Sequence, residues 1–378
     1  MTATGDIRNV ILLGHGGSGK TSLTEAILHT AGAISRLGSV DEKTTVSDYY
    51  DEEKEHQHSI LASIVHAQFN GKLINLIDTP GSPDFVGPAI AAMPAAETAI
   101  IVINAASGIE TNTRKLFALA AELGKPRMIV INKIAAENVD MPELIKNIQE
   151  TFGSQCRCAN LPAADRKSVI DCIENTAGDS PVMSVAEAHT QLIESVVEAD
   201  DAMMERYLGG EEIPAAEIAG VFVKALRIGK LIPIVFTEAR QEIGIKELLG
   251  LITQYTPSPA DVEPVKLVDG DKVTELKADP AGPLMGVVVR VAFDPRSNMK
   301  YSTLRIFSGT LKSDTNMMHN DDKKPLRPGH ILKPQGGETK EIDAGIAGDI
   351  VTLAKLEELK IGDLIHDGRV TGKYKMPP

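Results

Sequence analysis

A glycine-rich loop near the start of the chain constrains its fold more than any other feature. Residues 14–21 read GHGGSGKT and fit the phosphate-binding pattern G-x-x-x-x-G-K-[ST]. The apolar run Val10–Leu13 precedes the loop as a buried strand, and Leu23 and Ile27 follow it at helical spacing. In this order of strand, loop and helix, backbone N–H groups and the helix N-terminus converge on an anion. The pattern therefore predicts a phosphate-binding site.

The residues of the loop have separate predicted roles. Lys20 supplies a positive charge to the β- and γ-phosphates of a nucleotide, and the hydroxyl of Thr21 is placed to ligate Mg²⁺. The phosphate-contacting set that we predict is Gly14, His15, Gly16, Gly17, Ser18, Gly19, Lys20, Thr21, Ser22 and Gly81.

Two further motifs follow apolar runs. Asp78-Thr79-Pro80-Gly81 comes directly after Leu73–Ile77, so a carboxylate lies at the C-terminal end of a buried strand, where ligands bind in open α/β sheets. We expect Asp78 to hold Mg²⁺ through a water molecule and the Gly81 N–H to contact the terminal phosphate. Asn132 and Lys133 end another strand and suit base recognition, with the Lys133 stem stacked over a purine.

Composition excludes several classes of protein. The 378 residues favour two or three domains. Three cysteines are an odd number, which indicates a reducing cytoplasm, and Cys156-x-Cys158 has no matching Cys/His pair to complete a metal site. No run approaches the roughly 18 apolar residues of a membrane helix. The net charge of −13 argues against a general nucleic-acid coat.

Alternating strand-like and helix-like runs over the first part of the chain predict an α/β fold with a doubly wound, mostly parallel sheet. About a hundred residues separate Asn132 from Leu231, more than one crossover helix needs, so we expect an inserted helical or mixed subdomain. Short β-branched runs from Leu284 onward predict an antiparallel β-barrel. The expected units are 1–262 (P-loop domain, with the insertion at about 153–223), 263–282 (linker), 283–370 (barrel) and 371–378 (start of a second linker). The polar stretch 261–283 could also be an extended first strand of the barrel.

These motifs together resemble the elongation factor G family, specifically its divergent elongation-factor-G-like branch of translational GTPases. The similarity includes GHGGSGKTSLTEAIL, IDTPGSPDF and ALRIGKLIPIVFTEA, and continues through LRIFSGTLKS and AGDIVTLAKLEELKIGDLI in the expected barrel. It implies a GTP-binding domain with an inserted subdomain and a barrel, as in a longer protein cut before the domains that carry out translocation. It also implies GTP or GDP with Mg²⁺ as ligand and the ribosome as partner. We expect a cytoplasmic monomer with no membrane association.

The resemblance also assigns roles to single residues. It places Asn132, Lys133, Ala135 and Ala239 around the base. It makes Thr21 and Ser59 ligands of Mg²⁺, with Asp78 acting through water. Ser82 occupies the position from which the family orients the attacking water, and is the catalytic candidate.

Three positions depart from the family pattern. Ala135 replaces an aspartate that accepts two hydrogen bonds from guanine, and each lost charge-assisted bond removes ~1.5–3 kcal/mol of discrimination. Ser82 replaces a histidine and cannot supply an imidazolium. Glu238 replaces a small hydroxyl residue before Ala239, and we expect it to face solvent. The alternative is that Glu238 or Glu137 offers the missing acceptor.

Three functions follow from these observations. The first is a GTP-binding translation factor with nucleotide-dependent ribosome binding and a translocation-type role in the full-length protein, hence a GTPase whose hydrolysis is impaired by the departures. The second is a non-hydrolysing, ribosome-associated or regulatory homologue with weakened guanine specificity. The third, an ATP-using kinase on the same loop, is disfavoured because the insertion and the barrel match the translation factors.

Overall fold

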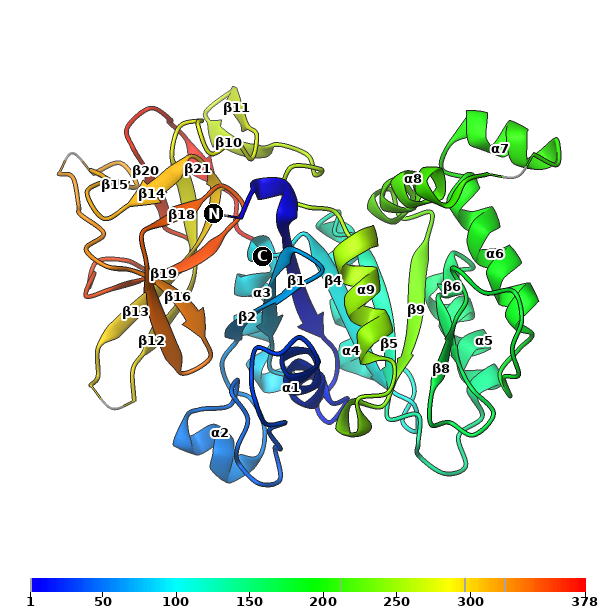
Figure 1. Ribbon diagram of the computed structural model, residues 1–378. Helices are drawn as coiled ribbons and strands as arrows, with labels where there is room; N and C mark the ends of the chain where they lie inside the picture. Colours follow the sequence, from blue (N-terminus) through cyan, green and yellow to red (C-terminus); the bar gives the residue numbers. More distant parts are fainter. Residues whose placement is uncertain (1, 212, 296, 323) are drawn as a thin grey trace.

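The computed structural model has a central α/β sheet with an antiparallel barrel-like domain on one side and a mainly helical insertion on the other (Figure 1). It describes residues 2–211, 213–295, 297–322 and 324–378. The central sheet has the order β2-β3-β1-β4-β5-β9-β6. Its strands are β1 (Ile7–Leu13), β2 (Ser63–Phe69), β3 (Lys72–Asp78), β4 (Thr98–Asn104), β5 (Arg127–Asn132), β6 (Cys156–Cys158) and β9 (Ile232–Thr237).

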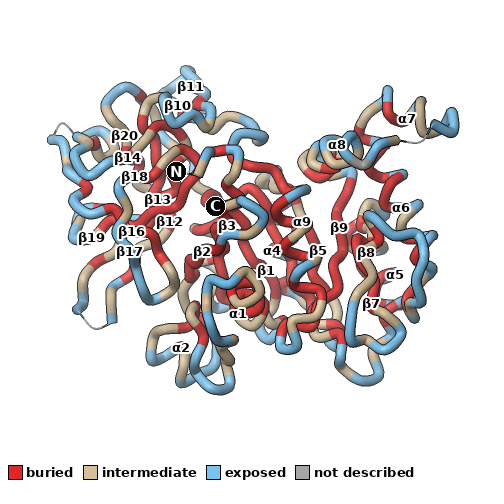
Figure 2. Tube along the Cα trace, in the orientation of Figure 1, coloured by how far each residue is buried: buried red, intermediate tan, exposed pale blue. Residues whose placement is uncertain are grey.

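Helices cover both faces of this sheet, which confirms the doubly wound architecture. Alternate residues of β1 enter different cores: Val10 packs with α1 (Lys20–Thr30) and α9 (Ile245–Tyr255), and Ile11 packs with the helices of the opposite face. Those helices are α3 (Val86–Ala92), α4 (Thr111–Glu122) and α5 (Met141–Phe152). The strands are therefore buried along almost their whole length (Figure 2). The neighbouring pairs are parallel except β2 with β3.

Shorter elements complete this part of the chain. They are α2 (Asp51–His56) and the 3₁₀ turns η1 (Thr4–Asp6), η2 (Pro83–Phe85), η3 (Met93–Ala95) and η4 (Ala239–Gln241). The η2 and η4 turns lie just after β3 and β9, so both border the edge of the sheet at which the parallel strands end.

The expected insertion contains one element that belongs to the central sheet. Strand β6 pairs in parallel with β9, so the segment from residue 153 first extends the sheet and then leaves it. The rest comprises β7 (Asn160–Pro162), β8 (Val169–Asp171), α6 (Val185–Val197), α7 (Asp201–Leu208) and α8 (Ala215–Arg227). Helices α6 and α7 are separate because Asp200 caps α7 by accepting a hydrogen bond from Met203 N at 3.2 Å.

The barrel-like domain is antiparallel, as expected. Its larger sheet has the order β15-β20-β12-β13-β19-β16-β17, and β14 pairs with β18. The strands are β12 (Met285–Phe293), β13 (Lys300–Ser308), β14 (Thr310–Lys312), β15 (Met318–His319), β16 (Ile331–Gln335), β17 (Glu338–Ile342), β18 (Ala344–Ile346), β19 (Ile350–Ala354) and β20 (Leu364–His366). Buried Val288, Leu304 and Val351 lie in its core.

The two segments expected as linkers form a small sheet instead. Strands β10 (Val265–Asp269) and β11 (Lys272–Leu276) make a hairpin, and β10 also pairs with β21 (Lys373–Tyr374). Leu267 is fully buried in this sheet, whereas its neighbours are polar or exposed. The two-residue turn Gly270-Asp271 between alternating residues is the pattern that predicts such a hairpin.

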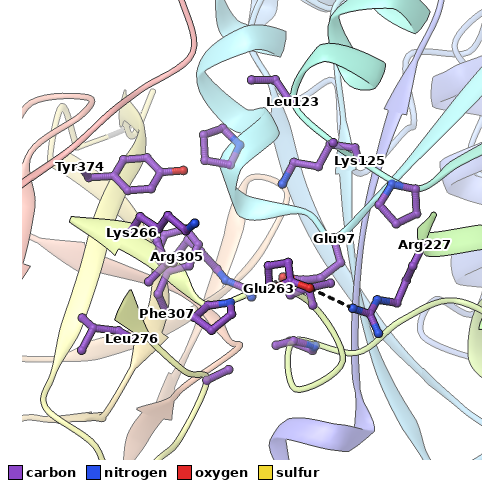
Figure 3. Close-up of a pocket in the computed structure, with 18 of the residues that line it drawn as sticks. Glu97, Leu123, Lys125, Arg227, Glu263, Lys266, Leu276, Arg305, Phe307 and Tyr374 are labelled. Carbon is purple, nitrogen blue, oxygen red and sulfur yellow. Dashed lines mark hydrogen bonds and ion pairs between the residues drawn. The ribbon is translucent and has the colours of Figure 1, made fainter. Parts of the chain in front are cut away.

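A buried polar network joins the barrel-like domain to the central sheet. Arg305 of β13 donates to Glu97, which directly precedes β4, with Nη2 to Oε1 at 2.6 Å, and both side chains are at most 6% exposed. The second oxygen of Glu97 accepts from Asn9 Nδ2 of β1 at 2.7 Å. Figure 3 shows Glu97 and Arg305 beside a cavity of about 490 Å³ between the two domains. The relative position of the domains is thus held by paired, desolvated charges.

Glu97→Gln is expected to lower the free energy of unfolding by ~3–5 kcal/mol, because it leaves the buried Arg305 guanidinium without a counter-charge. Urea unfolding followed by circular dichroism measures this. The control is Glu275→Gln, which removes one partner of the exposed Lys266–Glu275 pair and should cost under ~1 kcal/mol. Equal costs for both variants would contradict the role given to the network.

Candidate nucleotide-binding site

The glycine-rich loop connects β1 to α1, with Gly19 as the N-terminal cap of the helix. Gly19 has a φ of +92°, and a Cβ there would collide with the side-chain amide of Asn132, so this position requires glycine. Lys20 is 5% exposed and turns its Nζ back onto the loop, where it donates to Gly14 O at 3.1 Å and His15 O at 3.0 Å. Burial lowers the pKa of Lys20 to about 8.

A cavity of about 530 Å³ opens over this loop. Its lining includes Gly16, Gly17, Gly19, Lys20, Thr21, Ser22, Ser59, Gly81, Ser82, Lys133 and Arg240. Beside it, Ser18 Oγ and Asp78 Oδ1 are buried and have no hydrogen-bond partner among the described residues. Buried polar groups are normally paired, so these atoms, the buried ammonium of Lys20 and the open volume fit a bound phosphate group with its cation.

The oxygen atoms predicted to hold Mg²⁺ lie together. Thr21 Oγ1 is 3.3 Å from Ser59 Oγ, and Asp78 at the end of β3 accepts from Ser47 Oγ at 2.9 Å. Asp48 joins this cluster, because its Oδ1 accepts from Ser59 Oγ at 2.7 Å. Asp48 could not be singled out from the sequence, because Asp41 and Glu42 lie in the same polar run before α2.

The electrostatics of this cluster favour a cation. Burial raises the pKa of Asp48 to about 7, and the neighbouring charge of Asp78 adds to the effect. Burial also raises the pKa of Asp78, against the attraction of Lys20. Two buried carboxylates with two hydroxyls form an all-oxygen donor set of the kind that Mg²⁺ takes. The donor set fits Mg²⁺ held by Thr21 and Ser59, with the carboxylates close by.

Gly81 and Ser82 complete the phosphate side. A Cβ on Gly81 would lie 2.6 Å from Gly16 N, so the backbone after β3 packs directly against the glycine-rich loop. Ser82 borders the same cavity, and its Oγ accepts a long hydrogen bond of 3.4 Å from Asp84 N at the start of η2. A hydroxyl at this place can donate or accept a hydrogen bond but carries no charge.

Asn132 ties the loops after three strands together. Its Nδ2 donates to Ser18 O at 3.3 Å, and its Oδ1 accepts from Ala239 N at 3.1 Å. Both ends of the amide are therefore engaged by the protein. Lys133 lies against the glycine-rich loop, with Nζ donating to Gly17 O at 2.9 Å. Three of the four predicted base-side residues thus meet beside α1, and their polar atoms also hold the loops in place.

Ala135, the fourth base-side residue, is exposed, and its backbone N donates to Glu238 Oε2 at 3.1 Å. Glu238 is only 6% exposed, so the expectation that its carboxylate faces solvent is wrong. The side chain folds back because the loop after β9 closes in a tight bridge between Glu238 and Ile243, which aims it at the loop after β5. Glu137, the other acceptor considered, is exposed.

Two comparisons with family models agree with this geometry. Residues 5–258 match the model described as the elongation factor Tu GTP binding domain, and residues 283–368 match elongation factor G domain 2. The chain belongs to the elongation-factor-G-like translational GTPases. The first match covers the phosphate loop and the loops after β5 and β9, and the second covers the barrel-like domain.

Similar proteins extend the family match over nearly the whole chain. Curated proteins from two strains of Mycobacterium tuberculosis, each called elongation factor G-like protein, are 32% identical over 394 aligned residues, covering 96% of this chain and 55% of theirs. A crystal structure of a Thermus thermophilus protein superposes with a TM-score of 0.85 at 30% identity, over 99% of this chain and 56% of that one. This elongation-factor-G-like chain therefore spans about half the length of these relatives.

Other predicted features are placed as follows. Cys156, Cys158 and Cys172 are buried free thiols, and burial raises the pKa of each well above its ordinary value. In the described part of the chain, no three His, Cys, Asp or Glu side chains are grouped to hold a metal ion. Nor does any helix there combine the length and apolarity needed to cross a bilayer.

Lys20→Met is expected to weaken nucleotide binding by ~10- to 100-fold or more while leaving the nucleotide-free chain at least as stable at pH 7. The pKa of Lys20 is lowered from 10.5 to about 8, so the stability contributed by this group falls as the pH drops from 10.5 towards 8. At pH 7 Lys20 is charged, so the folded chain bears the free-energy cost of burying the ammonium. Methionine has no charge and removes this cost. Thermal unfolding without ligand and titration calorimetry with GDP measure the two effects.

Lys146→Met, at a surface position 64% exposed, is the matched control and should change neither quantity. A nucleotide-free Lys20→Met chain clearly less stable than the parent would contradict the account of the buried ammonium.

Proposed function

We propose that this chain binds GTP and GDP together with Mg²⁺ and forms the nucleotide-responsive part of a translation factor that acts on the ribosome. The observation that carries the proposal is the convergence of the glycine-rich loop, the oxygen cluster and the loops after β5 and β9 on one cavity. The match to the GTP-binding domain of elongation factor Tu supports it.

The residue roles in this proposal are those predicted from the sequence, with additions. Gly14–Ser22 and Gly81 contact the phosphates, and Thr21 and Ser59 ligate Mg²⁺ with Asp78 acting through water. Lys133 lies along the base. Asp48 adds a buried carboxylate to the cation side. Ser82 holds the water-orienting position, and we propose that GTP hydrolysis is slow because a hydroxyl supplies no charge there.

Contacts between the nucleotide site and the barrel-like domain support a nucleotide-dependent change in their arrangement. The segment that carries Asp48 and Ser59 also touches the barrel, through Tyr50 Oη to Phe293 O at 2.6 Å. Strand β2, which follows this segment, accepts from Gly336 N through Ile64 O at 2.9 Å. The same segment is held to α1, where Glu25 accepts from Val46 N at 2.7 Å. A shift of this segment on loss of the terminal phosphate would therefore reach the barrel.

The proposal also covers the domain organisation, the cellular location and the role of the whole protein. We propose a P-loop domain at 1–262 with its insertion, a barrel at 283–370, and a cytoplasmic monomer whose longer form takes a translocation-type role. The match to elongation factor G-like proteins supports the translation-factor role in this proposal.

Titration calorimetry of this chain with GTP, GDP and ATP in the presence of Mg²⁺ tests the proposal. We expect GTP and GDP to bind with Kd values of about 10 μM or tighter and ATP to bind at least ~10-fold more weakly. Lys20→Met serves as the negative control. Absence of binding by GTP and GDP at about 1 mM would refute the proposal, and preference for ATP would indicate an ATP-using protein instead.

A further inference from the structure

We propose that Glu238 supplies the carboxylate that recognises guanine in this chain, from the loop after β9 instead of the loop after β5. This inference rests on the proposed nucleotide binding and specifies the base that the site selects. It concerns the two residues that depart from the family pattern on the base side, Ala135 and Glu238.

The first observation is where the Glu238 carboxylate lies. Its Oε2 accepts from Ala135 N at 3.1 Å, so the carboxylate of one loop reaches the residue of the other loop that has lost its own. The backbone of Glu238 is held by two hydrogen bonds with Ile243, at 3.0 and 3.1 Å. Ala239, the next residue, is anchored to Asn132 Oδ1 at 3.1 Å. Glu238 is therefore fixed from both sides.

The second observation is that the Glu238 carboxylate can still accept further hydrogen bonds. Within the described residues, Oε1 has no hydrogen-bond partner, and no cation pairs with the side chain. An ionised carboxylate accepts about four hydrogen bonds, of which the backbone of Ala135 supplies one. The residue is 6% exposed, and its Oε1 is not among the fully buried atoms that lack a partner, so this oxygen stays accessible to a ligand.

The third observation is that the two departures complement each other in size and charge. Ala135 presents a methyl group, which leaves room for the longer Glu238 side chain beside it. An aspartate at position 135 would put a second carboxylate against Glu238, and two carboxylates so close disfavour the charged forms. The base side of the site thus still has one carboxylate, which comes from the loop after β9 instead of the loop after β5.

Guanine is the base whose edge matches a carboxylate. Its N1–H and 2-amino group are adjacent donors, which one carboxylate accepts side by side in charge-assisted hydrogen bonds. Adenine offers an acceptor at N1 and would face the carboxylate with a lone pair. Hypoxanthine keeps the N1–H but lacks the amino group, and xanthine replaces that group by a carbonyl oxygen. The relative affinities of the four corresponding nucleotides therefore show whether a carboxylate or an amide contacts the base.

The experiment measures Kd for GDP, IDP, ADP and XDP by titration calorimetry with the parent chain, Glu238→Gln and Glu137→Gln. The parent should prefer GDP to IDP and ADP. Glu238→Gln should weaken GDP binding by ~10- to 100-fold and shift preference towards XDP, because a glutamine amide donates to the xanthine carbonyl. Glu137→Gln, which removes an exposed carboxylate near the same loop, should leave all four affinities unchanged.

The outcomes separate this inference from the proposed function. If the parent binds none of the four nucleotides, the nucleotide site itself is refuted. If the parent selects GDP and Glu238→Gln keeps both the affinity and the selectivity, only the role of Glu238 is refuted. Loss of selectivity in Glu137→Gln instead would assign recognition to Glu137.

A double variant covers the possibility that Glu238→Gln does not fold. Ala135→Asp with Glu238→Ser returns the carboxylate to the loop after β5 and a small hydroxyl to the loop after β9. We expect this chain to bind GDP within ~10-fold of the parent and to prefer it to XDP. A folded double variant without preference for GDP would overturn the inference.

Discussion

One buried amide holds the candidate site together. Asn132 donates to the carbonyl of Ser18 in the glycine-rich loop and accepts from Ala239 N in the loop after β9, so it joins loops that are more than a hundred residues apart in the chain. The shape of the phosphate cradle depends on this bridge, because the Asn132 amide fills the space beside Gly19. The position of Glu238 depends on it too, since the next residue is the one that Asn132 anchors.

The phosphate side could be predicted from the sequence because its determinants are local. The loop, Thr21 and Asp78 are placed by apolar runs directly before them, and parallel strands bring their ends to one edge of a sheet. The base side could not be predicted from the sequence, because the direction of the Glu238 side chain is set by the bridge to Ile243 and by the contact with Ala135 in the loop after β5. Asp48 could not be predicted for a similar reason: helix α2 separates it in the chain from its partner Ser59.

The fold shows the same division between local and distant causes. The alternating apolar runs predict the sheet and the barrel-like domain, whereas half of residues 265–276 are polar, and this segment therefore resembles a linker. They form strands because Leu267 is buried against the barrel and β21 pairs alongside. The buried Arg305–Glu97 pair was equally hidden, since its residues are 208 positions apart and the sequence does not show that they meet.

The most direct test of this account is a crystal structure of the chain with a non-hydrolysable GTP analogue and Mn²⁺ in place of Mg²⁺, located by anomalous scattering. The account predicts the β-phosphate within the amides of residues 14–21, the metal beside Thr21 and Ser59, and the Glu238 carboxylate against the guanine edge. A cradle filled by protein side chains, with the nucleotide elsewhere or absent, would contradict it.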